Sequence, residues 1–126
     1  MMIYTSYYAK IKHLPEGVIP VSISRVTPKW AGDIKKCQKL APGFHILSAY
    51  KNTNDWSMYE KLYYEENLSK LDPNLVYNEL KTLSCGNDVC LMCFEGPKFH
   101  YHRHLVKDWL NEHGIQCQEF DFSKES

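Results

Sequence analysis

The stretch from Asp88 to Phe94 (DVCLMCF) runs through consecutive apolar residues between a polar turn and a loop that contains glycine and proline. An uninterrupted apolar run of this length, without alternation of polar and apolar positions, is typical of a strand buried on both faces of a parallel sheet. Parallel strands need crossover connections, usually helices. This segment therefore constrains the fold more than any other part of the chain.

The rest of the chain supplies the strands and helices that such a sheet requires. β-branched and aromatic residues bounded by turns predict further strands at 3–8, 18–25 and 115–122. Apolar residues at helical spacing predict helices at 56–68, 73–83 and 102–113. Asp72 is expected to cap the second helix and Gly114 to close the third. Segment 31–40 is compatible with a short helix, and 46–51 with a helical turn.

Length and composition indicate one soluble domain. The 126 residues suffice for a single hydrophobic core, and 44% of them are hydrophobic. We therefore predict an α/β fold: a single small domain with a mainly parallel open sheet flanked by helices, over residues 1–122, with 123–126 as a C-terminal tail. Nothing in the sequence indicates an oligomeric state.

The sequence favours a cytoplasmic protein. No apolar run approaches the roughly 18 residues of a membrane span, so no membrane association is expected. The N-terminus lacks the basic and apolar regions of a secretory signal. Five cysteines are an odd number, and disulfides seldom persist in the cytosol, so free thiols are expected.

Two arginines suggest a binding site for a small anionic ligand. Thirteen of the 15 basic residues are lysines, and the exceptions are Arg25 and Arg103. Arg25 is predicted at the carboxyl end of a strand, where ligands bind in open α/β sheets. Arg103 falls in the first turn of a helix, whose amino end favours anions. An alternative is that Arg103 pairs with Glu95. The predicted ligand-binding residues are Arg25, Arg103, Thr27, Lys98 and Tyr101.

The same region contains candidate catalytic groups. Cys93 lies at a strand end beside a helix amino terminus and imidazoles, a setting that favours a reactive thiolate, although a buried cysteine here is more often a packing residue. His102 is the candidate acid or base, and Glu95 a reactive or orienting group. The cysteine-phosphatase loop Cys-x5-Arg is not matched, because position 99 is phenylalanine.

A metal site is not favoured. Cys90 and Cys93 have zinc-ligand spacing, but residues three apart in a strand point to opposite faces. Cys93 with His100, His102 and Cys117 is geometrically easier and remains an alternative. We predict no metal and no cofactor.

Several of these motifs, in this order and spacing, resemble a prokaryotic family, domain of unknown function 488. The segments that carry the resemblance are Ile3-Tyr4-Thr5, Ile23-Ser24-Arg25, Thr27-Pro28-Lys29-Trp30, Leu71-Asp72-Pro73, Cys93-x-Glu95 and His102-Arg103-His104-Leu105-Val106.

The resemblance implies a compact α/β domain in which Cys-x-Glu and a Cys-His-Arg motif cluster with the arginine of the second strand. The residues of this sequence that match the family's motifs are Arg25, Cys93, Glu95, His102 and Arg103. Tyr101 departs from the pattern, because the family usually has a cysteine before His-Arg. A mechanism that needs two thiols in this loop is therefore in doubt for this chain.

The predicted function is an anion-binding or phosphate-binding pocket at the strand ends, belonging to an enzyme that acts on a nucleotide-like or phosphorylated small molecule. One alternative is a partner-binding domain without catalysis. Another is a nucleic-acid-associated module, which the zero net charge does not favour. Its basic face would use Trp30 for stacking, together with Lys10, Lys12, Lys29, Lys35, Lys36 and Lys39.

Overall fold

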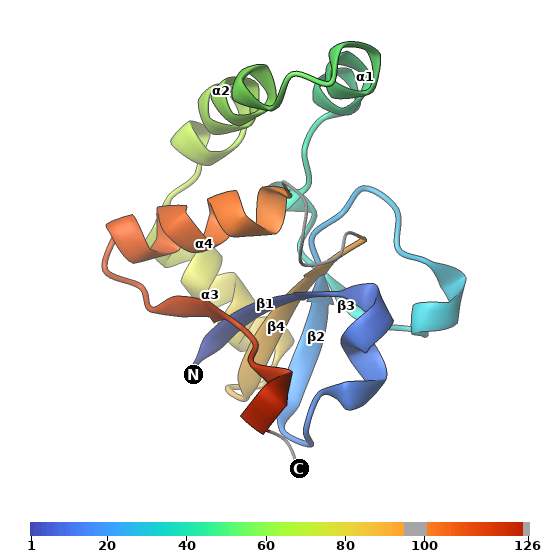
Figure 1. Ribbon diagram of the computed structural model, residues 1–126. Helices are drawn as coiled ribbons and strands as arrows, with labels where there is room; N and C mark the ends of the chain where they lie inside the picture. The colour runs from blue at the N-terminus through green and yellow to red at the C-terminus, as the bar shows by residue number, and fades with distance from the viewer. Residues whose placement is uncertain (95–100, 125–126) are drawn as a thin grey trace.

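The sheet is built around the apolar strand predicted from the sequence. In the computed structural model, which describes residues 1–94 and 101–124, β4 (Asp88–Cys93) is the central strand of five. All pairings are parallel, and the order is β3-β2-β4-β1-β5 (Figure 1). The other strands are β1 (Ile3–Tyr7), β2 (Val18–Ser22), β3 (Lys35–Lys36) and β5 (Cys117–Glu119). The predicted α/β fold with a parallel open sheet is confirmed.

Burial on both faces explains the composition of β4. Its residues from Val89 to Cys93 are fully buried. Leu91 and Cys93 face the main core, whereas Cys90 and Met92 face a smaller cluster on the other side of the sheet. These five positions of β4 are therefore shielded from water, which explains why none of them is polar.

The four α-helices of the described residues all contribute to the main core. They are α1 (Phe44–Thr53), α2 (Trp56–Glu66), α3 (Pro73–Leu83) and α4 (His102–Glu112). Each buries apolar side chains, for example Ile46 in α1, Tyr63 in α2, Leu80 in α3 and Leu110 in α4. Figure 1 shows α1 and α2 beyond the carboxyl ends of β2 and β4, with α3 and α4 closer to the sheet.

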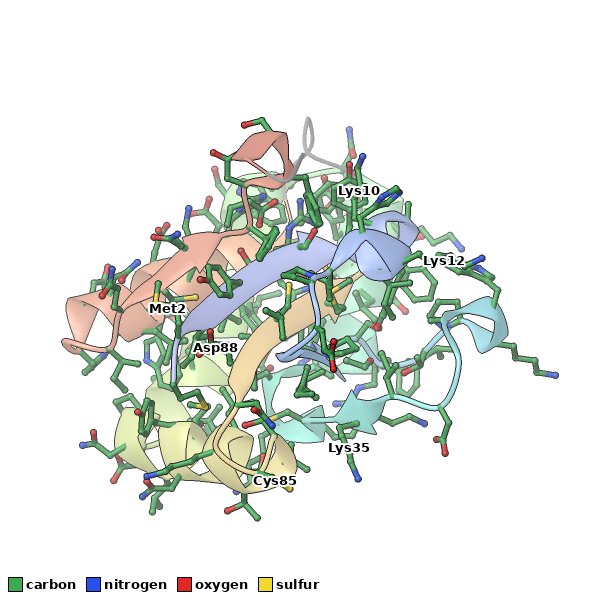
Figure 2. The ribbon with its side chains drawn as sticks, turned by 90° about the horizontal axis from the view of Figure 1, so that it is seen from below. Met2, Lys10, Lys12, Lys35, Cys85 and Asp88 are labelled. Atoms are coloured by element: carbon green, nitrogen blue, oxygen red, sulfur yellow. The ribbon has the colours of Figure 1, made fainter. Side chains whose placement is uncertain are left out.

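The opposite face of the sheet has a thinner cover. The 3-10 helix η1 (Tyr8–His13) follows β1 and packs Ile11 over Cys90 and Met92. Lys10 and Lys12 project outward from this helix (Figure 2). The crossover from β1 to β2 therefore contains a single short 3-10 helix where a longer α-helix is usual.

Local signals at two helix ends act as predicted. The side chain of Asp72 accepts a hydrogen bond from the backbone N–H of Asn74 at 2.9 Å, with Pro73 as the first residue of α3. Gly114 adopts a φ of 79°, the left-handed conformation that ends α4 without a side-chain clash.

Two local predictions were wrong. Segment 31–40 is not one helix but contains η2 (Lys29–Ala31), β3 and η3 (Gln38–Leu40). Gly32 takes a φ of 86°, and the N–H of Cys37 donates to the carbonyl of Ser22, so this segment joins the sheet beside β2. Conversely, 46–51 is more than a turn, because α1 continues until Asn54 ends it in the left-handed conformation.

Strand and helix lengths also differ from the predictions at their ends. β2 ends at Ser22, three residues before Arg25, and β5 contains three residues.

The α-helices of the described residues have at most 11 residues, and none is long and apolar enough to span a bilayer. All five cysteines lie in the described part and are free thiols, as their odd number suggested.

Candidate functional site

The carboxyl ends of β2 and β4 bring together residues that are far apart in the sequence. Cys93 ends β4, Arg25 follows β2, and α4 begins at His102 directly after Tyr101. The structure therefore places these predicted site residues at one edge of the sheet, with Arg103 in the first turn of α4. This is the edge at which open α/β sheets bind ligands.

Arg103 is fully buried and held by an internal carboxylate. Its Nη2 lies 3.1 Å from Oε2 of Glu119, and its Nε lies 3.2 Å from Oε1. Its Nη1 lies 3.3 Å from the Sγ of Cys93. The centres of the Tyr7 and Tyr101 rings lie 5.4 and 5.3 Å from its guanidinium carbon, respectively. Arg103 thus joins α4 to both β4 and β5.

The surroundings of Arg103 keep it charged. Burial alone would lower the pKa of Arg103, but the hydrogen bonds to Glu119 and the contact with Cys93 raise that pKa above its ordinary value. Glu119 also accepts a hydrogen bond from Oγ1 of Thr5 at 2.5 Å. Sequence reasoning missed Glu119, for which the available signal was a carboxylate, one of two with Asp121, in the predicted last strand.

His102 is a neutral, buried imidazole. It is 4% exposed, and its Nε2 lies 2.8 Å from the carbonyl oxygen of Ile23. A carbonyl can only accept, so Nε2 carries the proton and Nδ1 carries the lone pair. Burial is the main cause that lowers the pKa of His102 to about 4; the nearby charge of Arg103 adds to it, and the bond to Ile23 opposes it. Within the described residues, Nδ1 has no hydrogen-bond partner.

A cavity of about 190 Å³ lies next to His102. The polar residues on its wall are Ser24, Arg25 and His102. Nε of Arg25 donates to the carbonyl of Pro42 at 2.9 Å, and the guanidinium carbon lies 5.4 Å from the centre of the Phe44 ring. The remaining wall is apolar and consists of Val26, Pro42, Phe44, Leu47 and Phe94. The cavity therefore combines a cationic donor and a neutral acceptor with a largely apolar surface.

A chain of hydroxyl groups runs beneath this cavity. The hydroxyl of Tyr8 lies 2.7 Å from Oγ of Ser22 and 2.6 Å from Oγ of Ser24. Ser24 donates to the carbonyl of Val26, and Thr27 donates to Ser22 at 2.8 Å. Because each hydroxyl donates once, the direction is set: Thr27 to Ser22, Ser22 to Tyr8, and Tyr8 to Ser24. The hydroxyl proton of Thr27, a residue predicted to bind ligand, is thus donated within the protein, and its oxygen can still accept a hydrogen bond.

The two cysteines of β4 point in opposite directions, as the alternation of side chains along a strand requires. Cys90 and Cys93 lie on opposite faces of β4. Burial raises the pKa of Cys90, and it raises the pKa of Cys117 to about 12, so both remain thiols near neutral pH. No group of three metal-ligating side chains is found in the described ranges, 1–94 and 101–124.

Part of the predicted site lies outside the described residues. Glu95, Lys98 and His100 fall in segment 95–100, as does the Gly96-Pro97 pair. The predicted pairing of Arg103 with Glu95 also depends on that segment. Within the described residues, the carboxylate that binds Arg103 is that of Glu119.

The family comparison covers most of this arrangement. The model of the DUF488-N3a family, described as the active DUF488-N3 subclade, matches residues 7–114. This range includes Arg25, Cys93, His102 and Arg103, and it ends before Glu119. No curated protein and no solved structure matches the chain.

Proposed function

Because this chain belongs to the DUF488-N3a family, described as an active subclade, we propose that the cavity between Arg25 and His102 is its working site. We propose that this site binds a nucleotide-like or phosphorylated small molecule and acts on it by acid–base chemistry. The observation that carries the proposal is the meeting of a guanidinium and a neutral imidazole in one apolar cavity at the carboxyl edge of the sheet.

Arg25 is the proposed anion ligand. It is half-buried, and the hydrogen bond to Pro42 uses its Nε. Among the described residues, its two terminal nitrogens make no hydrogen bond and no carboxylate pairs with it. A guanidinium held at Nε presents its outer N–H groups as a fork, which matches the oxygens of a phosphate.

His102 is the proposed proton acceptor. Its Nδ1 lone pair is available because Nε2 is committed to Ile23. An anion bound at Arg25 favours the imidazolium form and so raises the pKa of His102 from about 4. Ligand binding and proton uptake are therefore coupled, and the ligand is expected to bind more tightly as the pH falls from 7 towards 5.

Arg103 is a proposed positioning residue. It is fully buried and paired with Glu119, so it acts on the cavity through the first turn of α4, where it neighbours His102. Its contact with Cys93 ties that turn to the end of β4. A guanidinium at this distance stabilises negative charge on sulfur, which keeps Cys93 as the proposed reactive thiol. Roles for Glu95, Lys98 and Tyr101 beside the ligand stay predictions.

A ligand screen tests the proposal. Thermal unfolding is measured with inorganic phosphate, nucleoside monophosphates, sugar phosphates and uncharged nucleosides, for the wild type, Arg25→Gln and Lys51→Gln. Lys51 is an exposed cation on α1 and serves as the matched control. A ligand at a hundred times its Kd adds roughly 2.7 kcal/mol, which is several degrees in a domain of this size.

The expected result is stabilisation by a phosphorylated ligand in the wild type and in Lys51→Gln, with the shift lost in Arg25→Gln. Equal shifts in all three proteins would remove Arg25 from the site. The absence of any shift across the whole panel would refute the proposed ligand class.

A further inference from the structure

Exposed apolar side chains gather around the mouth of the cavity. Six large apolar side chains are exposed in the described residues, and four of them lie at this edge of the sheet: Val26, Trp30, Phe44 and Phe94. Val26, Phe44 and Phe94 line the cavity itself. Their exposed fractions are 62%, 67% and 50%, respectively, and that of Trp30 is also 62%. Such a patch on a small domain marks a contact surface.

The aromatic rings of this patch are supported from below. The buried ring of Tyr8 meets Phe94 edge-on at 5.0 Å between ring centres and Trp30 edge-on at 6.5 Å. Arg25 lies over the ring of Phe44. Despite these contacts, Trp30 and Phe44 keep most of their surface exposed, and an exposed ring surface is what a stacked base requires.

Charge is distributed unevenly between the two parts of the chain. Residues 1–54 contain eight of the 15 basic residues and two of the 15 acidic ones, so their net charge is +6 and that of residues 55–126 is −6. The basic part comprises β1 to β3, η1 and α1, whereas α2, α3 and α4 belong to the acidic part (Figure 1). The zero net charge of the whole protein thus conceals a basic N-terminal part of the chain.

Three of the four patch residues, Val26, Trp30 and Phe44, belong to the basic part of the chain, and several of its cations lie near them. Lys29 precedes Trp30, Arg25 lies in the cavity wall, and Lys10 and Lys12 extend from η1 (Figure 2). The two acidic residues of this part are Glu16 and Asp33. A negatively charged partner with planar groups complements such a surface better than an apolar protein face does.

We infer that the pocket receives one nucleotide of a single-stranded nucleic acid, whose neighbouring bases stack on Trp30 and Phe44 and whose backbone contacts Lys29 and the lysines of η1. This inference rests on the proposed function and specifies its substrate. A duplex would keep its bases stacked on each other, whereas single strands offer free base faces to aromatic side chains.

The test measures binding of fluorescently labelled oligonucleotides of about 12 nucleotides by anisotropy. Binding of single-stranded DNA, single-stranded RNA and duplex DNA is measured separately. The comparison of the two single strands shows whether the protein prefers deoxyribose or ribose. Trp30→Ala is compared with Tyr64→Ala, which removes an aromatic ring 49% exposed on α2. Trp30→Phe keeps a stacking ring at the same position.

We expect single strands to bind better than the duplex. Trp30→Ala should weaken single-strand binding about tenfold, since a stacked base contributes roughly 1–3 kcal/mol. Trp30→Phe should restore most of the affinity, and Tyr64→Ala should change nothing. Lys29→Gln should make the affinity less dependent on salt, by the amount expected for the loss of about one phosphate contact.

The outcomes separate this inference from the proposed function. If a mononucleotide binds through Arg25 but oligonucleotides bind no more tightly and Trp30→Ala has no effect, the inference is overturned and the proposed function stands. Trp30-dependent strand binding that survives Arg25→Gln unchanged would overturn the proposed pocket. Self-association lost in Trp30→Ala, without oligonucleotide binding, would assign the patch to a protein contact and overturn the inference.

Discussion

The guanidinium of Arg103 and the carboxylate of Glu119 form an ion pair whose two members differ in their access to water. The side chain of Arg103 is fully buried, whereas that of Glu119 is 31% exposed. Nη2 and Nε of Arg103 both contact the carboxylate, so α4 and β5 are joined by a two-point bond. The consequences of losing either partner are therefore unequal.

Glu119→Gln is expected to lower the free energy of unfolding by about 3 kcal/mol, because it removes the negative charge of Glu119 from beside a fully buried guanidinium. Arg103→Met should have the smaller effect, since Glu119 can reach water and keeps its bond from Thr5. Urea denaturation of both variants measures the difference. A larger loss in Arg103→Met would contradict the asymmetry.

The free energy of unfolding should decrease as the pH falls from about 6.5 to about 4. Over this interval the unfolded chain protonates His102, whose ordinary pKa is 6.5, while in the folded state burial holds that pKa at about 4. The unfolded state thus binds more protons, and stability falls by about 3 kcal/mol in total. The lowered pKa of His104 acts in the same direction.

Urea denaturation at several pH values tests this dependence. His102→Gln should remove most of the slope between pH 6.5 and pH 4, whereas His13→Gln, at an exposed position, should retain it. An unchanged slope in His102→Gln would mean that other groups carry the acid sensitivity.

Tyr8→Phe should reduce the free energy of unfolding by roughly 1–3 kcal/mol, because Ser22 and Ser24 are buried and lose the hydroxyl that lies between them. The added change Ser22→Ala should produce a smaller loss in the Tyr8→Phe background than in the wild type. Chemical denaturation of the four proteins forms a double-mutant cycle, and strictly additive losses would show that the two hydroxyls are not coupled.

Thiol labelling should distinguish Cys85 from Cys37 and Cys117. Iodoacetamide at mildly alkaline pH is expected to modify Cys85 rapidly, because that residue is exposed. Cys37 and Cys117 should react slowly, since they are buried and burial is the main reason that each has a pKa of about 12. Mass spectrometry identifies the modified residues, and Cys85→Ser should abolish the fast phase. Rapid labelling of Cys37 or Cys117 would reveal opening of the core.

The sequence predicted the main elements because their signals are local. The apolar run of β4 and the cap at Asp72 can each be recognised within a few residues. The two-residue strand β3 is too short to show any periodicity, and its pairing with β2 depends on a neighbour outside its own segment. It was therefore mistaken for part of a helix.

The sequence predicted which residues belong to the candidate site better than it predicted the contacts between them. Arg25, Cys93, His102 and Arg103 were selected from residue type and position along the chain. The orientation of Arg103 towards Glu119, 16 residues later, and the bond of Tyr8 to Ser22 follow from the packing of helices against strands that are distant in the sequence. Chemistry of single residues is visible in a sequence, whereas partners across the fold are not.

The central place of β4 also determines when the sheet can form during synthesis. β4 separates β1 from β2, and Ile3 is in register with Val89. A nascent chain on the ribosome therefore holds β1 and β2 without their shared neighbour until the codons for β4 have been translated. Folding must wait for most of the protein to be made, which leaves two strand edges for chaperones to shield in the meantime.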